Sequence, residues 1–327
     1  MAQTNSANIV IAGNVLPILQ ETLAQNGQVQ QFLDPAGKDR VAFEASLTTT
    51  DALLATSAIT VNEALLAKAP NLKVISQPSV GVDNIDLDAC TAHKIPVGHT
   101  PGVLVEATAD LAFGLLLSAA RRIPAGWNFV KSGAWGEKQS FALGVDLYGK
   151  TLGIVGMGRI GSAVVRRAQA SGMKVIYHNR HRHPDEAALK ADYVSFDQLL
   201  ASADFVLLLL PLTKESEGLF NRETFAKMKP SAYLINIARG KIVDSEALYD
   251  ALTTGKIAFA ALDVTDPEPL PGDHKLLSLD NILVSPHIGS ATKETRHAMA
   301  LLAAENLLSG LADKALPACA NSAANYK

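Results

Sequence analysis

The chain has 327 residues, of which 48% are hydrophobic and 19% are charged, and its formal net charge at pH 7 is −3. This composition predicts a soluble folded protein long enough for two domains and excludes a disordered chain, while the charge gives no reason to expect nucleic acid or an anionic membrane as a partner. The two cysteines, Cys90 and Cys319, are too few for a disulfide framework or a thiolate metal site, so a reducing cytoplasm is the expected location.

The first hundred residues alternate short apolar strands with helical segments. We expect strands at 8–12, 72–76 and 95–98 and a helix at 16–25. No basic segment followed by an apolar core precedes the first strand, and the apolar stretch at 111–120 is shorter than the about 20 residues of a membrane span. Neither a secretory signal nor a membrane segment is therefore expected.

A long helix rich in alanine and leucine is predicted from Val103 to Arg122. Cationic Arg121 and Arg122 at its end suit the helix dipole, and we expect this helix to connect two domains. The segment Asn128–Asp146 has no clear periodicity and is long for a loop in a compact domain. It is expected to be either an arm that reaches a partner subunit or a surface loop.

From Lys150 to about Pro286 the sequence again alternates strands with helices. The expected strands are 152–155, 174–177, 205–209, 233–235, 259–262 and 282–284. Strands separated by helices indicate parallel βαβ units and a doubly wound sheet. A final amphipathic helix, Lys293–Gly310, is expected to return to the first domain.

A dinucleotide-binding motif follows the strand at 152–155. Gly156-Met157-Gly158-Arg159-Ile160-Gly161 lies between this strand and a helical segment, as the G-x-G-x-x-G pattern requires. Gly156 allows the tight turn, Gly158 lets the backbone approach a pyrophosphate, and Gly161 lets the helix pack on the strand. Amides near Arg159 and Ile160 would face the anion. The alternative is a glycine-rich turn of another α/β protein.

The next strand indicates which dinucleotide is preferred. NAD sites usually place an acid about 20 residues beyond the glycines. This chain instead has Tyr177-His178-Asn179-Arg180-His181-Arg182-His183, with no acid. Guanidinium groups attract a 2′-phosphate, so we expect NADP(H) to be preferred, with NAD(H) possible. Asn179 and Arg180 are the first candidates for binding the 2′-phosphate, and Arg182 is the second. The alternative is that this segment is a solvated basic loop.

Three residues with acid–base and anion-binding chemistry follow successive predicted strands. Arg239, Glu268 and His287 should converge where parallel strands end at one edge of the sheet. His287 would donate a proton to the alkoxide formed by hydride transfer to a ketone, while Glu268 would stabilise the imidazolium and fix its tautomer. Arg239 would hold a substrate carboxylate. Taken singly, each residue could equally be a surface, solvated or packing side chain.

These motifs together resemble the D-2-hydroxyacid dehydrogenase family. The matching segments span nearly the whole chain, and those around Pro267–Leu270 and His287–Thr292 are most similar to glyoxylate/hydroxypyruvate reductases and 2-ketogluconate reductases. The resemblance implies an α/β fold of two Rossmann-like domains with doubly wound parallel sheets, separated by a cleft. The substrate-binding domain would comprise residues 1–101 and 290–327, and the dinucleotide-binding domain residues 102–289.

The resemblance also implies roles for individual residues. Arg239 would orient the substrate, Glu268 would pair with the histidine, and His287 would be the general acid/base. Further substrate contacts would come from the amides of Val80 and Gly81 and from Ser290. Cofactor contacts beyond the glycine motif and the basic loop would come from Thr108, Pro211, Ile237, Asp263 and Gly289.

The family is typically a homodimer joined through the arm that includes Trp135. Some glyoxylate reductases bring a second tryptophan of this arm into the neighbouring pocket, whereas here Gly136-Glu137-Lys138-Gln139-Ser140 follows without another indole. The histidines show no metal-ligand spacing, and no metal is expected.

Two function classes stay open. The first is a cytoplasmic NADPH-dependent reductase of small 2-oxo acids, in which glyoxylate and hydroxypyruvate compete with 2-ketogluconate as substrate. The second is a non-enzymatic dinucleotide sensor like the corepressors built on this fold. Turnover of a 2-oxo acid would distinguish the two.

Overall fold

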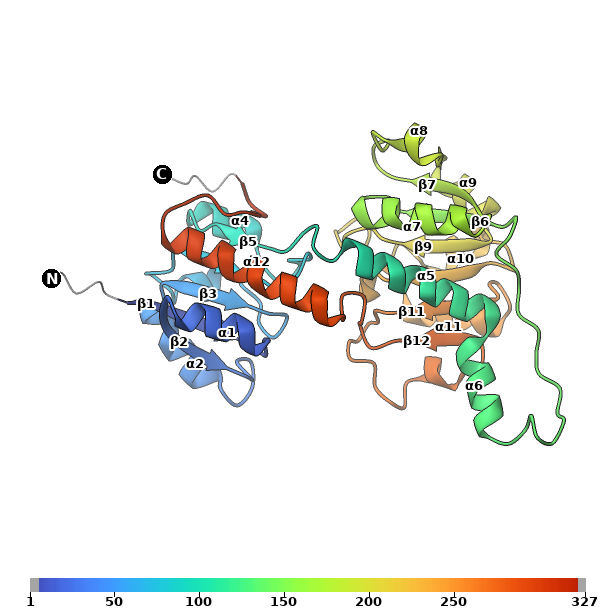
Figure 1. The fold of residues 1–327 in the computed structure, drawn as a ribbon, viewed down its shortest axis with the longest axis horizontal. Helices are drawn as coiled ribbons and strands as arrows, with labels where there is room; N and C mark the ends of the chain where they lie inside the picture. Colours follow the sequence, from blue (N-terminus) through green and yellow to red (C-terminus); the bar gives the residue numbers. More distant parts are fainter. Residues whose placement is uncertain (1–5, 323–327) are drawn as a thin grey trace. The chain divides into compact units, whose positions relative to one another are not determined.

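The computed structural model describes residues 6–322, which form two compact units (Figure 1). Unit 1 comprises residues up to 104 and those from 292 onwards, and unit 2 comprises residues 105–291. Each unit has its own sheet, and every pairing between neighbouring strands is parallel. The expected α/β fold with two doubly wound parallel sheets is therefore confirmed.

Unit 1 contains a five-stranded sheet in the order β2-β1-β3-β4-β5. Its strands are β1 (Ala7–Ala12), β2 (Gly27–Phe32), β3 (Ala52–Ala55), β4 (Val74–Ser76) and β5 (Val97–Gly98). Its helices are α1 (Pro17–Ala24), α2 (Arg40–Ser46), α3 (Glu63–Leu66), α4 (Leu87–Ala92) and α12 (Lys293–Leu311), with a 3₁₀ helix, η1, at Leu47–Thr49.

Helices cover both faces of this sheet. Leu19 and Leu23 of α1 and Leu307 of α12 belong to the core on one face, whereas Phe43 of α2 and Cys90 of α4 belong to the core on the other. A Cβ atom at Gly310 would lie 2.5 Å from a Val74 methyl group, so α12 packs closely on β4. The predicted return of the last helix to the first domain is confirmed.

Unit 2 contains a seven-stranded sheet in the order β12-β11-β10-β9-β6-β7-β8. Its strands are β6 (Thr151–Val155), β7 (Lys174–His178), β8 (Asp192–Tyr193), β9 (Phe205–Leu208), β10 (Tyr233–Asn236), β11 (Phe259–Leu262) and β12 (Ile282–Val284). Its helices are α5 (Val105–Arg121), α6 (Ile123–Lys131), α7 (Arg159–Ala170), α8 (Glu186–Leu189), α9 (Phe196–Ser202), α10 (Arg222–Lys227) and α11 (Ser245–Thr253), with 3₁₀ helices η2 (Gly240–Ile242) and η3 (Lys275–Ser278).

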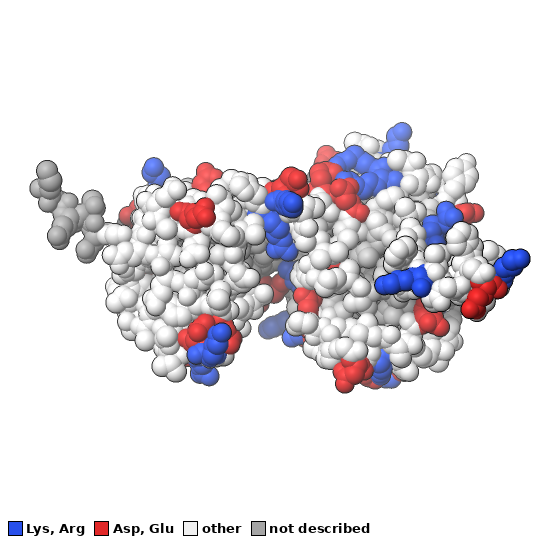
Figure 2. Space-filling view, turned by 60° about the horizontal axis from the view of Figure 1, so that its bottom comes forward, with Lys and Arg blue, Asp and Glu red and all other residues white. Residues whose placement is uncertain are grey.

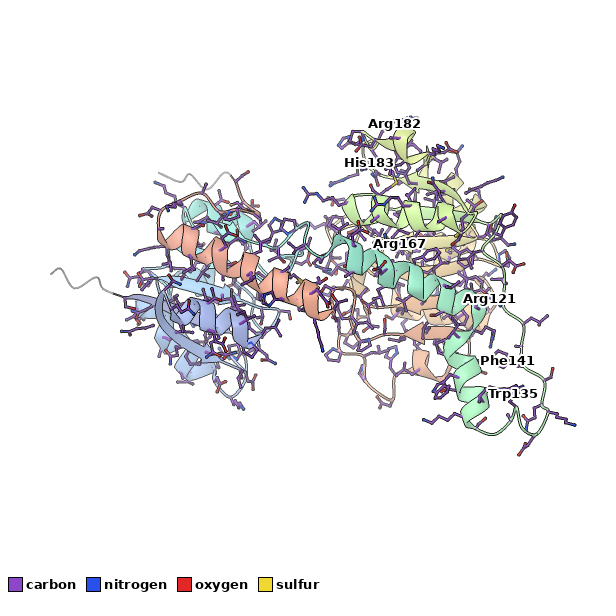
Figure 3. The ribbon with its side chains drawn as sticks, in the orientation of Figure 1. Arg121, Trp135, Phe141, Arg167, Arg182 and His183 are labelled. Atoms are coloured by element: carbon purple, nitrogen blue, oxygen red, sulfur yellow. The ribbon has the colours of Figure 1, made fainter. Side chains whose placement is uncertain are left out.

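Charged side chains lie mainly in small groups of mixed sign on the face drawn in Figure 2. One such group joins α5 to α7, where Arg167 donates to Asp110 at 2.5 Å and to Glu106 at 2.9 Å (Figure 3). Among residues 6–322, no helix has the length and apolar character needed to cross a membrane.

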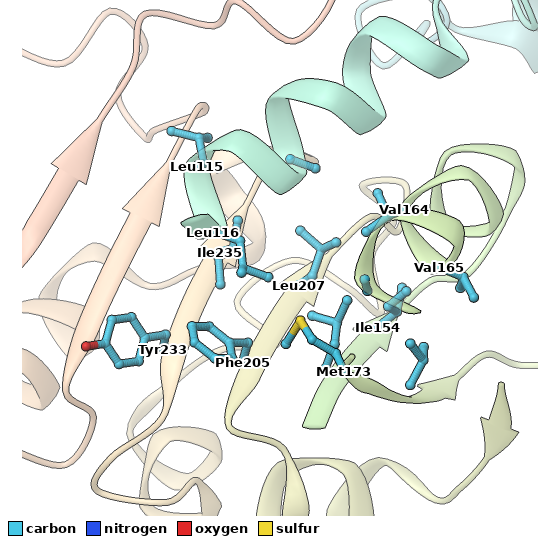
Figure 4. Packing of buried hydrophobic residues seen from close by; sticks show 14 of the residues in the cluster. Leu115, Leu116, Ile154, Val164, Val165, Met173, Phe205, Leu207, Tyr233 and Ile235 are labelled. Carbon is cyan, nitrogen blue, oxygen red and sulfur yellow. The ribbon is translucent and has the colours of Figure 1, made fainter. Parts of the chain in front are cut away.

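Apolar residues of α5 and α7 pack on one face of the unit 2 sheet (Figure 4). Leu116 and Val164 are completely buried there, and the rings of Phe205 and Tyr233 lie 5.0 Å apart between centroids. Helices α9, α10 and α11 contribute to the core on the opposite face. This two-sided burial explains why the central strands are short, nearly continuous apolar runs.

Two expectations need correction. The segment Asn128–Asp146 is not entirely irregular, because α6 continues through Lys131. The short strands β2, β3 and β8 were not expected. Strand β2 has the sequence GQVQQF at a sheet edge with mostly half-exposed or exposed residues, so it lacks the apolar run by which the other strands were predicted.

Candidate functional site

An imidazole and a carboxylate meet at the carboxyl edge of the unit 2 sheet. The Nδ1 atom of His287 lies 2.5 Å from Oε1 of Glu268. A carboxylate can only accept, so Nδ1 carries the proton of this bond and Nε2 is left as the atom that can exchange a proton with a ligand. The predicted pairing of these two residues is observed.

The order of the strands explains why these residues come together. Strands β10, β11 and β12 are neighbours in the sheet, and Arg239, Glu268 and His287 follow them in turn. Parallel strands end at the same edge, so loops far apart in sequence converge there.

A glycine lets the first two loops approach each other. A Cβ atom at Gly240 would lie 1.9 Å from the carbonyl oxygen of Thr265, so only glycine fits beside this backbone. The preceding turn is held by the buried side chain of Asn236, which donates to the carbonyl of Arg239 at 2.9 Å and accepts from the amide of Ala238 at 3.0 Å. The Nη1 atom of Arg239 donates to the carbonyl of Ala238 at 2.7 Å.

The environment of Glu268 favours its ionised form. Burial is the largest single influence and acts to raise the pKa of this carboxyl, whereas the hydrogen bond and the charge of His287 act to lower it. The amide of Thr265, 3.3 Å from Oε2, and the charge of Arg239 act in the same direction as His287. The pKa of Glu268 is consequently lower than its ordinary value, and the carboxylate is the stable form beside the imidazole.

The buried carboxylate of Asp263 holds the loop that carries His287. It accepts from the hydroxyl of Ser285 at 2.6 Å and from the amides of Ile288 and Gly289, both at 2.8 Å. His287 itself has a backbone φ of +51°, a left-handed conformation that is unusual for a residue with a side chain. These bonds fix the loop around a residue whose backbone is strained.

The glycine motif has the conformation that a pyrophosphate requires. Gly156 has φ of +91°, and a Cβ atom there would lie 2.6 Å from the amide nitrogen of Leu210. A Cβ atom at Gly158 would meet nothing within 4 Å, so the space above this residue is open. In the described chain, the amides of Arg159 and Ile160 in the first turn of α7 have no acceptor. These features fit a dinucleotide bound at the start of α7.

Asn179 and Arg182 of the basic loop are engaged with protein atoms. The Asn179 side chain accepts from the amide of Met157 at 2.6 Å and donates to its carbonyl at 2.8 Å, which ties the loop to the glycine motif. Arg182 donates to Glu186 at 2.6 Å and lies over the ring of Tyr193 (Figure 3). Arg180 is exposed and forms no hydrogen bond or ion pair within residues 6–322.

Other predicted cofactor positions lie near this edge of unit 2. The methyl group of Thr108 would be 3.5 Å from a Cβ atom at Gly289. Ile237 is buried in the turn before Arg239, and the carbonyl of Pro211 accepts from Ser216 at 2.8 Å. Ser290 follows Gly289 in a turn closed by a hydrogen bond from Ala291 to Ile288. Direct cofactor or substrate contacts by these residues stay predictions.

The predicted anion-binding loop lies in unit 1, after β4. Among the described residues, the amides of Ser79, Val80, Gly81 and Val82 have no hydrogen-bond acceptor. Successive amides without an acceptor are candidates for binding a carboxylate, as the sequence analysis expects of Val80 and Gly81. No group of three or more His, Cys, Asp or Glu side chains in residues 6–322 is arranged to hold a metal ion.

Sequence reasoning missed the residues that position the site. The part played by Asn236 and the loop-holding role of Asp263 were not predicted, nor was the pairing of Arg182 with Glu186. The isolated polar residue at the end of an apolar strand, as in Tyr233–Asn236, is a signal that could have found Asn236. The bonds of Asp263 reach residues 22 to 26 positions further on and have no comparable local signal.

Comparison with known proteins agrees with this arrangement. The family model described as "D-isomer specific 2-hydroxyacid dehydrogenase, NAD binding domain" matches residues 113–289. A glyoxylate reductase of Thermococcus litoralis is 46% identical over 287 residues, covering 86% of each chain. The human glyoxylate reductase/hydroxypyruvate reductase is 48% identical over 254 residues, covering 77% of each chain.

A solved structure shows the same fold over almost the whole length. It is an NADPH-dependent glyoxylate/hydroxypyruvate reductase of Sinorhizobium meliloti in complex with NADP and malonate. Its TM-score is 0.90 at 29% sequence identity, with 98% of each chain covered.

Proposed function

The chain belongs to the D-isomer specific 2-hydroxyacid dehydrogenase family and is an oxidoreductase, and we propose that it reduces glyoxylate and hydroxypyruvate to the corresponding 2-hydroxy acids with NADPH. The observation that carries this proposal is the hydrogen-bonded pair of His287 and Glu268 at the edge of a dinucleotide-binding sheet. The names of the relatives support these substrates, and 2-ketogluconate is the competing candidate.

The proton is delivered by His287. Glu268 holds Nδ1 and stabilises the imidazolium, so Nε2 can donate to the substrate oxygen as negative charge develops on it. Arg239 follows β10, the neighbour of the strand that precedes Glu268, and it pairs with the substrate carboxylate and polarises the adjacent carbonyl. In unit 1, the amides at 79–82 are proposed to bind a substrate carboxylate. When bound, the dinucleotide supplies the hydride.

The preference for NADP(H) rests on Arg180. Within residues 6–322, Arg180 forms no hydrogen bond or ion pair, whereas Arg182 is paired with Glu186. The loop offers no acid at the position where an NAD site needs one for the ribose 2′-hydroxyl. NAD(H) is the weaker alternative. In this proposal the unit with residues 105–291 binds the cofactor, and the unit with residues 1–104 and 292–327 binds the substrate.

We also propose that the protein is a cytoplasmic homodimer. Apolar side chains are exposed along α6 and the segment after it, including Trp127, Trp135 and Leu143. An exposed apolar surface of this kind is typical of a protein interface. Neither Cys90 nor Cys319 forms a disulfide within residues 6–322, which is compatible with a reducing compartment.

Steady-state turnover tests the proposed reaction. NADPH oxidation is measured with glyoxylate, hydroxypyruvate and 2-ketogluconate, for the wild type and for His287→Ala. The proposal requires turnover of glyoxylate or hydroxypyruvate that falls by about a hundredfold or more in the variant. Turnover of 2-ketogluconate alone would reassign the substrate. A wild-type protein that binds NADPH but reduces none of the three would refute the proposed substrate class.

A further inference from the structure

The carbonyl groups of Ser79, Val80 and Gly81 in the unit 1 loop each accept a hydrogen bond from within that unit. The carbonyl of Ser79 accepts from the amide of Thr100 at 2.8 Å. The carbonyl of Val80 accepts from Nδ1 of His99 at 3.1 Å, and the carbonyl of Gly81 accepts from Nε2 of Gln77 at 2.8 Å and from the hydroxyl of Ser79. Three successive peptide groups therefore have a fixed orientation, with their carbonyls paired and the amides at 79–82 unpaired.

His99 is itself firmly placed. Its amide donates to the carbonyl of Ala318 at 3.2 Å, and its carbonyl accepts from the buried side chain of Asn306 at 2.9 Å. Because a backbone carbonyl can only accept, Nδ1 of His99 carries the proton of the bond to Val80. The imidazole thus acts as a fixed donor behind the loop.

Gln77 has a corresponding role on the other side of the loop. Its buried Nε2 atom lies 2.8 Å from the carbonyl of Gly81, 3.1 Å from the hydroxyl of Ser79 and 3.0 Å from Oδ1 of Asn84. Asn84 cannot reverse its amide, because Nδ2 already donates to the carbonyls of Thr56 and Ile59. The Oε1 atom of Gln77 is left buried without a partner. An unpaired buried oxygen is unfavourable for stability, and it is retained here while the amide nitrogen holds the loop.

We propose that His99 and Gln77 are positioning residues for substrate binding. They hold the carbonyls of Val80 and Gly81, and this keeps the amides of residues 79–82 directed at the carboxylate of a 2-oxo acid. The inference rests on the proposed function and deepens it, since it identifies side chains of unit 1 that contribute to the affinity for the substrate.

The test uses a matched pair of variants at His99. His99→Ala removes the donor to Val80, whereas His99→Asn places an amide nitrogen at the position of Nδ1. At saturating NADPH, His99→Ala should raise the KM for glyoxylate about tenfold and change kcat less than about twofold, because the carboxylate contact that is weakened is the same in the bound substrate and in the transition state. The KM for NADPH should stay at the wild-type value. His99→Asn should restore the KM for glyoxylate to within about twofold of the wild type.

Gln77→Glu is a second test of the inference. The carboxylate of the glutamate has no N–H group to donate to the carbonyl of Gly81. The variant should show the same selective rise in the KM for glyoxylate, in protein whose circular dichroism matches the wild type. The inference is overturned if His99→Ala keeps the wild-type KM, if His99→Asn fails to restore it, or if the KM values for NADPH and glyoxylate rise together. Failure of Gln77→Glu to fold leaves the decision to the His99 pair.

Calorimetric binding of oxalate in the presence of NADP⁺ separates this inference from the proposed reaction. The wild type could bind oxalate and yet reduce no 2-oxo acid. If His99→Ala then weakens oxalate binding about tenfold, the positioning role is supported and the proposed reaction is wrong. If the wild type neither reduces a 2-oxo acid nor binds oxalate, both are wrong.

Discussion

Glu268 holds Nδ1 of His287 at 2.5 Å, and its ionised form is favoured by that contact. The pair is the acid–base element of the proposed reaction, and the carboxylate contributes both a hydrogen bond and a charge. The two contributions can be separated, because a glutamine keeps an oxygen acceptor of the same shape but carries no charge.

Glu268→Gln should reduce kcat for glyoxylate about tenfold to a hundredfold at neutral pH. The glutamine still offers an oxygen to Nδ1 of His287, but the negative charge beside the imidazole is lost, and this charge complements the positive charge of the ring as proton donor. Steady-state kinetics with glyoxylate at saturating NADPH measures the effect. Equal kcat values of the wild type and the variant would show that the charge of Glu268 has no part in proton transfer.

The same residue predicts a pH dependence of stability. The pKa of Glu268 is lowered from 4.5 in the folded protein, so its ionised form stabilises the fold above that pH. This contribution is lost as the pH falls through the lower folded value. Thermal unfolding should show the wild type losing stability relative to Glu268→Gln below about pH 4.5. A constant difference in Tm between neutral pH and pH 3 would contradict the assignment.

Asp263→Ala should displace the loop that carries His287. The substitution leaves the amides of Ile288 and Gly289 without their acceptor, and the unfolding free energy should fall by about 2–4 kcal/mol. His287 has a left-handed backbone that these bonds hold in place. The factor by which kcat falls should therefore be larger than the factor by which the KM for NADPH rises. Denaturant unfolding and steady-state kinetics measure the two effects. Wild-type kcat in the variant would show that the loop keeps its shape without Asp263.

The strands of the sheets could largely be predicted because burial on both faces produces short apolar runs. Strands β6, β9, β10 and β11 are almost entirely buried and were predicted within one residue at each end. Helix α6 was not predicted, because none of its residues is buried and its apolar side chains do not follow a core-facing pattern.

Candidate reacting groups could be proposed where a chemically distinctive residue follows such a strand. Arg239, Glu268 and His287 are of this kind, and they follow the neighbouring strands β10, β11 and β12 as expected, while their roles in a reaction stay predictions. The residues that hold these side chains in place could not be predicted, because their hydrogen-bond partners are distant in sequence. The bonds of His99 to Val80 and of Asn306 to His99 span 19 and 207 residues, and no local pattern connects such positions.

Arg180→Ala should raise the KM for NADPH about tenfold or more and leave the KM for NADH nearly unchanged, because the lost guanidinium binds only the 2′-phosphate. Arg182→Ala is the matched control from the same loop. Arg182 is already paired with Glu186, so its loss should raise the KM for NADPH less than about threefold. Equal effects of Arg180→Ala on both cofactors, or a larger selective effect of Arg182→Ala, would reassign the 2′-phosphate site.

Gly240→Ala should lower both stability and activity. The added methyl group would lie 1.9 Å from the carbonyl oxygen of Thr265, so the backbone must move and the unfolding free energy should fall by at least about 1–3 kcal/mol. Arg239 is adjacent, and kcat/KM for glyoxylate should fall with it. Gly272→Ala, where a Cβ atom meets nothing within 4 Å, should leave both quantities unchanged. Equal stability of the two variants would contradict the close approach.

Leu143→Glu combined with Trp135→Glu should yield a monomer. Leu143 is 93% exposed and Trp135 is 70% exposed, and both follow α6 in the chain. Figure 3 labels Trp135. Two charges placed in an apolar interface would remain unpaired when buried, so association should weaken by several kcal/mol. Light scattering after size-exclusion chromatography should give the mass of two chains for the wild type and of one for the variant. Val41→Glu, at an 84% exposed position on α2 of unit 1, is the control and should keep the dimer mass. If the double variant keeps that mass, the dimer forms through another surface; a monomeric wild type would reject the proposed assembly outright.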